Sequence, residues 1–211
     1  MLKRRINETE KYEDDLLFYL KLNGSPIDSI NGLTPSSNND FGSYIHESYT
    51  TGSAAYLGSN KVSYNISNIG LNTKNFTIEF NFIKLSNPDH NDHRCIFSTS
   101  KSRVSSFTFR YGGYNYGFVL HLGDLWYGEN TGWMSDSFNT NCSNKIKLTR
   151  SNNVSRVYFN GIFQRSVTSS RTLDMNNLYF SDIGYTGDDG TVSSDLPPVY
   201  IDEFKIYNGI K

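Results

Sequence analysis

The 211-residue sequence has almost no excess of either charge. Its 20 lysines and arginines nearly balance its 21 aspartates and glutamates, which gives a formal net charge of −1. A chain with this balance has no long-range field that would attract nucleic acid or an anionic membrane surface. We therefore expect no nucleic-acid partner.

The sequence also lacks a long apolar run. No segment reaches the roughly 18 apolar residues that a membrane-spanning helix needs. The first residues, MLKRRINETEKYEDD, include basic side chains, but no apolar stretch of about 7–15 residues follows them, as it would in a secretory signal. The sequence thus predicts a protein made in a cytoplasm, without a signal peptide and without a membrane span.

Cysteine is scarce. Cys95 and Cys142 are the two cysteines of the chain, and they lie far apart in the sequence. Two cysteines do not make a disulfide framework, so we expect free thiols, while the sequence leaves open whether the two pair in the fold.

Windows rich in alanine, glutamate, lysine and leucine, which are typical of helices, are missing too. Charged residues make up 19% of the chain and aromatic residues 15%. Asparagine, serine, glycine and threonine fill the gaps between short apolar runs. This composition is typical of many short strands joined by polar turns.

Alternation of apolar and polar side chains predicts the strands. It is cleanest in NFTIEFNFI, where phenylalanine or isoleucine occupies every second position from Phe76 to Phe82. Asn160-Gly161 predicts a two-residue hairpin turn, because both positions favour a positive φ. Further alternating runs lie at 16–22, 106–110, 117–121, 145–149, 156–159, 179–183 and 199–207. The pattern predicts one domain of two antiparallel sheets packed face to face over residues 16–211, preceded by a charged N-terminal arm at 1–15.

One aspartate stands out in the last strand, YIDEFKIYN. Strict alternation places Asp202 on the face of Phe204 and Ile206, and Glu203 on the opposite face. A buried carboxylate is costly unless it is hydrogen-bonded, paired or bound to a metal. Since neighbours on a strand face opposite ways, Asp202 and Glu203 are not expected to flank one glycosidic bond as a catalytic pair.

Five segments together resemble a known family: LLFYLKLNGSPIDSINGLTP, AAYLGSNKVSY, FTIEFNFI, KIKLTRSNNVSRVYFNGIFQ and YIDEFKIYNGI. In their order and spacing they resemble the laminin G-like, or concanavalin A-like, jelly roll of the lectin and glucanase class. The resemblance extends from about Leu16 to Lys211. It implies an all-β fold, a two-sheet antiparallel jelly-roll sandwich.

The resemblance also implies a structural calcium ion, held by the aspartate at the position of Asp202 together with the loop after the first strand. In this sequence that loop offers Asp28, Asn31 and main-chain carbonyls. Such oxygen ligands suit Ca²⁺. The alternative for Asp202 is a carboxylate that accepts hydrogen bonds from main-chain N–H groups at a bulge or corner, with no metal.

Hydrolases that share this fold class carry E-x-D-x-E or E-x-D-x-x-E, and neither spacing occurs in the sequence. We therefore expect no enzymatic activity. A glycan-degrading hydrolase with acids drawn from distant strands is the alternative.

The segment RYGGYNYGFVLHLGDLWYGENTGW is rich in aromatic residues set among glycines and polar side chains, Tyr111 being the first of them. Exposed rings beside polar groups form the usual platform for a sugar. Burial of the rings at a sheet edge or in a homo-oligomer contact is the alternative. The predicted ligand-binding residues are Tyr114, Tyr116, Trp126, Tyr127 and Trp133.

The expected function is a non-enzymatic binding module for a glycan, such as a cell-surface polysaccharide, or for a partner protein. The composition, the missing signal and the charged arm favour a virion component, for instance a phage capsid-decoration or tail protein. The arm would then anchor it to other virion proteins. A cytoplasmic or extracellular location, and a purely structural oligomer, are the alternatives.

Overall fold

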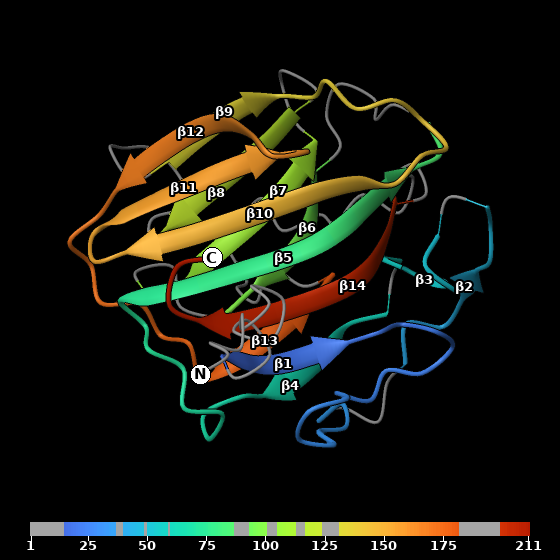
Figure 1. Ribbon diagram of the computed structural model, residues 1–211, viewed down its shortest axis with the longest axis horizontal. Coiled ribbons are helices and arrows are strands. Elements are labelled where there is room, and N and C mark those ends of the chain that lie inside the picture. The colour runs from blue at the N-terminus through green and yellow to red at the C-terminus, as the bar shows by residue number, and fades with distance from the viewer. Residues whose placement is uncertain are drawn as a thin grey trace, which may run out of the picture.

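The computed structural model describes residues 15–36, 40–48, 50–58, 60–86, 93–100, 105–112, 117–123, 131–181 and 199–211. Within these ranges the chain forms fourteen strands and no helix. The strands make two antiparallel sheets that pack face to face (Figure 1). The all-β, two-sheet antiparallel jelly-roll sandwich predicted from the sequence is confirmed. The N-terminal arm lies outside these ranges, except for Asp15.

The larger sheet lies in front in Figure 1. Its order is β12 (Ile162–Thr168), β11 (Val154–Phe159), β10 (Asn144–Ser151), β5 (Asn75–Lys84), β14 (Val199–Asn208), β3 (Ala54–Tyr56) and β2 (Tyr44–Ile45), and β1 (Leu16–Leu20) pairs with β14 as well. The smaller sheet has the order β4 (Val62–Asn65), β13 (Asn177–Phe180), β6 (His93–Ser98), β7 (Phe107–Gly112), β8 (Gly117–Leu122) and β9 (Thr131–Ser135).

Aromatic side chains fill the space between the sheets. The alternation in β5 is confirmed, because Phe76, Phe80 and Phe82 are buried against the smaller sheet. Phe204 of β14 lies near the centre of the core, and its ring contacts those of Phe18, Phe80, Phe97 and Phe180. Edge-to-face and stacked ring pairs of this kind stabilise a core beyond the area that they bury.

The edge strands β9 and β12 approach each other where the two sheets meet. A Cβ at Gly132 in β9 would lie 2.5 Å from Cγ2 of Val167 in β12, so only glycine leaves room for this contact. We predict that Gly132→Ala lowers the free energy of unfolding by about 1 kcal/mol through overpacking. Urea unfolding measures this loss.

A double-mutant cycle tests the cause of that loss. Val167→Ala removes the methyl group that the new Cβ would meet, so Gly132→Ala should cost less in the Val167→Ala background. An equal cost in both backgrounds would contradict the clash.

The predicted hairpin turn and the unbridged cysteines are also found. Asn160 and Gly161 have φ angles of 49° and 82°, as a type I′ turn requires. Cys95 and Cys142 are thiols that are not joined in a disulfide. In the part of the chain that the structure describes, no helix is long and apolar enough to cross a membrane.

β14 departs from strict alternation, which corrects the sequence-based placement of Asp202. A β-bulge lies between Asp202 and Lys205, and Glu203 is the extra residue, with a φ of 54°. Asp202 pairs with Asn81 and faces outward, whereas Phe204 faces the core. The prediction that Asp202 shares the face of Phe204 is therefore wrong, because the inserted residue reverses the alternation between them.

Candidate functional site

The outer face of the larger sheet carries a straight row of side chains, one from each of six neighbouring strands. Their register pairs each residue with the next. We call this the cross-strand row: Phe163, Tyr158, Lys147, Glu79, Lys205 and Tyr19. The residues on either side of each row member along its strand point mostly into the core, so these six point outward.

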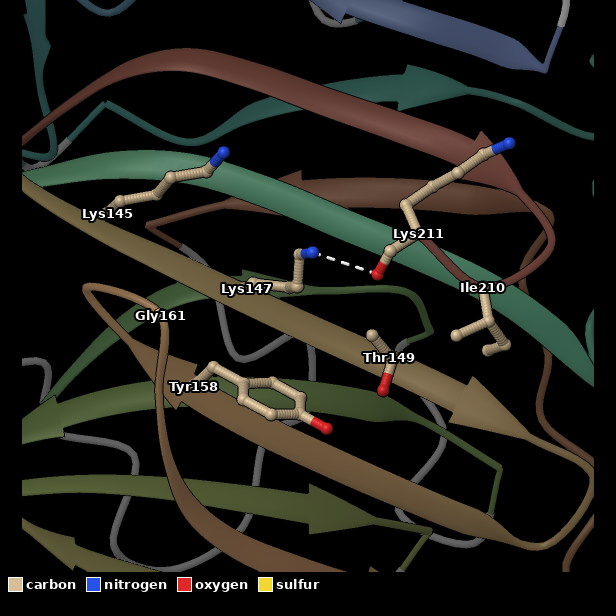
Figure 2. A pocket seen from close by; sticks show the side chains of 7 residues that line it. All are labelled: Lys145, Lys147, Thr149, Tyr158, Gly161, Ile210 and Lys211. Carbon is tan, nitrogen blue, oxygen red and sulfur yellow. Dashed lines mark hydrogen bonds between the residues drawn. The ribbon is translucent and has the colours of Figure 1, made fainter. Parts of the chain in front are cut away.

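A hollow of about 320 Å³ opens at the Tyr158 end of this row. Its lining residues are Lys145, Lys147, Thr149, Tyr158, Gly161, Ile210 and Lys211. Figure 2 shows the first three in a line along β10, with Tyr158 on one side and the C-terminal pair on the other. The hairpin turn contributes Gly161, so the sequence signal for that turn also places part of the site.

The charges at the hollow converge on a single carboxylate. Oε2 of Glu79 lies 2.8 Å from Nζ of Lys145, and its Oε1 lies 3.2 Å from Nζ of Lys147. Burial raises the pKa of Glu79, but the two ammonium groups outweigh burial and leave this pKa below its ordinary value. Nζ of Lys147 also donates a hydrogen bond to the main-chain oxygen of Lys211, at 2.8 Å (Figure 2).

Apolar surface surrounds the same hollow. The rings of Tyr158 and Phe163 meet edge to face, with their centroids 5.7 Å apart. Ile210, which lines the hollow, is 50% exposed, and Phe163, which pairs with Tyr158, is 53% exposed. Large apolar side chains this exposed mark a surface that can bind a ligand. The hollow therefore combines one aromatic ring, that of Tyr158, with hydrogen-bond donors.

The other end of the row is closed by its own contacts. Nζ of Lys205 lies 4.5 Å from the centroid of the Tyr19 ring and 2.8 Å from Oε2 of Glu203. The Tyr19 hydroxyl donates a hydrogen bond to the same carboxylate oxygen. Because these groups satisfy one another, the Tyr158 end is the more accessible to a ligand.

Asp28 and Asn31 lie together in the loop after β1. Oδ1 of Asp28 accepts hydrogen bonds from the N–H groups of Tyr19 and Ile30, and Oδ2 accepts from the main chain and side chain of Asn31. Among the described residues no hydrogen bond links this pair to Asp202, and no three acidic, histidine or cysteine side chains form a metal-binding group. A calcium ion shared by Asp28, Asn31 and Asp202 would have to replace the bonds of Asp28.

Asp202 has no exposed surface, although it faces outward. Its Oδ2 accepts a hydrogen bond of 2.9 Å from the N–H of Thr51, and its Oδ1 has no partner in the described ranges. Burial raises the pKa of Asp202 from its usual 3.8 to about 6; the Thr51 N–H opposes this rise and the Glu203 carboxylate adds to it. This geometry matches the alternative of a carboxylate bonded to a main-chain N–H at a bulge.

Because of the bulge, the expectation that Asp202 and Glu203 lie on opposite faces of the strand is also wrong. Glu203 contacts Tyr19 and Lys205, which face outward, so both carboxylates lie on the outer face. Since Asp202 is fully buried, it is not accessible to a substrate. The pair thus remains unsuited to catalysis, for a different reason.

The predicted aromatic ligand residues lie largely beyond the described ranges. This holds for Tyr114, Tyr116, Trp126 and Tyr127, and for the side chain of Trp133, whose main chain belongs to β9. Their role stays a prediction.

Tyr111, from the same aromatic segment, is in the core. Its hydroxyl donates to Oδ2 of Asp136, which also pairs with Lys84. At least one aromatic residue of this segment, Tyr111, therefore belongs to the core and not to a binding surface.

Comparisons with known proteins identify the fold. No family model and no curated protein match the sequence. Among solved structures, one of botulinum neurotoxin type C, whose cell entry depends on two ganglioside molecules, matches with a TM-score of 0.70 and 14% identity over 97% of this chain and 50% of that chain. The binding domain of botulinum neurotoxin DC, in complex with rat synaptotagmin II, matches with a TM-score of 0.69 and 15% identity over 95% and 50%.

A third neighbour has nearly the same length as this chain. It is domain 4 of AbnA, a GH43 extracellular arabinanase from Geobacillus stearothermophilus, in complex with arabinotriose. It matches with a TM-score of 0.56 and 16% identity over 92% of this chain and 93% of that chain. The chain spans about half the length of the neurotoxin chains. At these identities the similarity shows a shared β-sandwich fold.

Proposed function

We propose that the protein is a non-enzymatic carbohydrate-binding module that takes a saccharide in the hollow at Tyr158. One observation carries the proposal: the half-buried ring of Tyr158, in contact with the exposed ring of Phe163, lines the hollow together with Lys145 and Lys147. The apolar face of a sugar ring packs on an aromatic ring, while polar side chains bond its hydroxyl groups. Structural neighbours described with arabinotriose and with gangliosides support this class of ligand.

The lining of the hollow supports binding without catalysis. Glycoside hydrolysis generally needs two carboxyl groups flanking the scissile bond. None of the seven lining residues has a carboxylate side chain. Glu79 lies beside them, but it is only 12% exposed and is paired with two lysines. A bound saccharide would therefore meet donors and rings, not an acid and a base.

The aromatic segment offers a second proposed site on the same protein. Tyr114, Tyr116, Trp126, Tyr127 and Trp133 were predicted from the sequence to bind a ligand, and that proposal stands beside the one for the hollow. The two are separable by mutation, because Tyr158 and Trp126 belong to different parts of the chain.

A glycan array with neutral and acidic saccharides, probed with the labelled protein, tests the proposed function. Saccharides that bind are then titrated by calorimetry into the wild type, Tyr158→Ala and Trp126→Ala. Binding that is lost in Tyr158→Ala but kept in Trp126→Ala places the saccharide in the hollow. The opposite pattern favours the aromatic segment, and an array without binding, together with release of reducing ends from polysaccharides, would favour the hydrolase.

A structural calcium ion at Asp202 remains a proposal from the sequence resemblance, supported by the unpartnered Oδ1 of that residue. On this proposal, calcium raises the melting temperature of the wild type and excess chelator lowers it, while Asp202→Asn responds to neither. Thermal unfolding under these conditions measures the response. Equal melting temperatures of the wild type with calcium and with chelator would contradict a structural calcium ion at Asp202.

A place on a virion surface, with residues 1–15 attaching the module to other virion proteins, is a further proposal from the sequence, as is a protein partner in place of a glycan. Electron microscopy of particles labelled with antibody against this protein would test the virion location.

A further inference from the structure

We propose that the hollow prefers acidic saccharides, which carry a carboxylate or sulfate group, over neutral ones. This inference rests on the proposed function, since it names the class of saccharide for the same site.

The lining of the hollow is positively charged. Three of its seven residues are lysines and none is acidic. Lys145 is the most accessible of the three, with 56% of its side chain exposed. Lys211 is turned toward Asp15, with which it forms an ion pair. The lysines that remain for a ligand are therefore Lys145 and Lys147.

The acidic partner of these two lysines compensates only one of their charges. Glu79 is shared between Lys145 and Lys147, so two positive side chains face one negative side chain, and Lys147 donates in addition to the main-chain oxygen of Lys211. Arg156 pairs with Thr149 across β11 and β10 and faces outward beside the hollow. Among the described residues no ion pair joins Arg156 to a carboxylate. An incoming anion would thus meet more positive than negative side chains, with Lys145 the more accessible of the two lysines.

The pKa of Glu79 shows how the neighbouring lysines affect a negative charge at this surface. Burial alone would raise the pKa of its carboxyl group, yet the neighbouring lysines leave this pKa lowered. The field of the lysines therefore stabilises a negative charge by more than partial burial costs it. A ligand carboxylate or sulfate near Lys145 would meet the same two lysines with less desolvation, in a field that the charge of Glu79 reduces.

The ring pair and the lysines can serve one ligand. Lys147 pairs directly with Tyr158 across β10 and β11, so the two side chains rise from neighbouring strands, whose main chains lie about 5 Å apart. A sugar ring packed on Tyr158 would place a substituent near Lys147 or Lys145. An acidic group at that substituent gains a charge-assisted hydrogen bond, which a neutral hydroxyl lacks.

Matched pairs of probes that differ only in charge test the inference. Oligogalacturonate is compared with its fully methyl-esterified form for a carboxylate, and dextran sulfate with dextran for a sulfate. Calorimetry at low and high sodium chloride measures the affinities of the wild type, of Lys145→Gln, and of Lys74→Gln, which removes an exposed lysine outside the hollow. Single-stranded polyuridylate serves as a polyanion that is not a saccharide.

We expect at least one acidic probe to bind about tenfold more tightly than its neutral partner, with affinity falling as salt rises. Lys145→Gln should weaken that binding about fivefold and weaken neutral binding by clearly less, because glutamine can still hydrogen-bond a hydroxyl group, while Lys74→Gln changes neither. Which acidic probe binds distinguishes carboxylate from sulfate recognition.

Two results would overturn the inference while leaving the proposed function in place: a neutral saccharide that binds as tightly as its acidic partner, or acidic binding that Lys145→Gln leaves unchanged. Polyuridylate binding as tightly as the acidic saccharides would show a general polyanion surface and also overturn it. If none of the saccharides binds, and the glycan array is blank as well, the proposed function fails with it.

Discussion

The stability difference between the wild type and Asp202→Asn should change by about 2–3 kcal/mol between pH 4 and pH 7. The carboxyl group of Asp202 is fully buried and its pKa is raised from 3.8 to about 6 in the folded protein. One unit of pKa corresponds to about 1.4 kcal/mol, so the full shift corresponds to about 3 kcal/mol. Asparagine keeps the shape of the side chain without its charge.

The direction follows from proton binding. Below pH 3.8 the group is protonated in the folded and the unfolded state and has no differential effect. Between pH 3.8 and about 6 the folded state holds a proton that the unfolded state has lost, so the stability of the wild type falls as pH rises. Above about pH 6 the group is ionised in both states, and the wild type has lost the full stabilisation that it had at low pH. Asp202→Asn lacks this ionisable group, so its free energy of unfolding should rise relative to that of the wild type between pH 3.8 and about 6.

Urea unfolding of both proteins at pH 4, 5, 6 and 7 measures the difference. Groups common to the two proteins, such as Glu79 with its lowered pKa, cancel in the comparison. Glu203→Gln is a useful control, because removing the neighbouring charge should reduce the pH dependence without abolishing it. A difference that stays constant from pH 4 to pH 7 would contradict the burial of an ionisable group at this position.

Tyr158→Ala should weaken saccharide binding by about 2 kcal/mol, or about thirtyfold, because truncation removes the ring on which the sugar packs. The change also exposes the ring edge of Phe163, which the tyrosine contacts. Since Tyr158 faces outward from β11, we expect the variant to fold.

Tyr158→Phe is the matched variant for this prediction. It retains the ring and loses only the hydroxyl group, so most of the affinity should remain. Calorimetric titration of the best-binding saccharide into the three proteins measures both effects. Equal losses in the two variants would mean that the hydroxyl group, and not the ring, makes the important contact.

Most long strands of the core could be predicted because each carries its own alternation, whereas β6 was not predicted, since its buried residues Cys95, Ile96 and Phe97 follow one another without alternation. β5 is the clearest case: its phenylalanines face the core as the sequence indicates. The turn at Asn160-Gly161 was equally visible, since its residue types specify the positive φ angles that the structure shows.

The bulge in β14 could not be predicted from alternation. Glu203 adopts a φ of 54°, which is unusual for a residue other than glycine, and contacts with Tyr19 and Lys205 hold its side chain. These partners come from β1 and from the far side of the bulge. A period-two pattern therefore assigns Asp202 to the wrong face.

The candidate site was missed for a related reason. The cross-strand row depends on the register of six strands, and its members are spread from Tyr19 to Lys205 in the sequence. No local motif marks them.

The surroundings of Asp28, outside this site, did have a local signal. An aspartate in a turn commonly accepts hydrogen bonds from N–H groups two or three residues ahead, as Asp28 does from Ile30 and Asn31.

The most direct test of the central claim is a map of amide chemical-shift changes on binding. The wild-type protein, labelled with nitrogen-15, is titrated with oligogalacturonate or, if that does not bind, with the tightest saccharide from the array. We predict that the largest changes fall at residues 145–149, 158–163 and 210–211, around the hollow. Changes confined to residues 113–116 and 124–133 would place the saccharide on the aromatic segment and contradict the account.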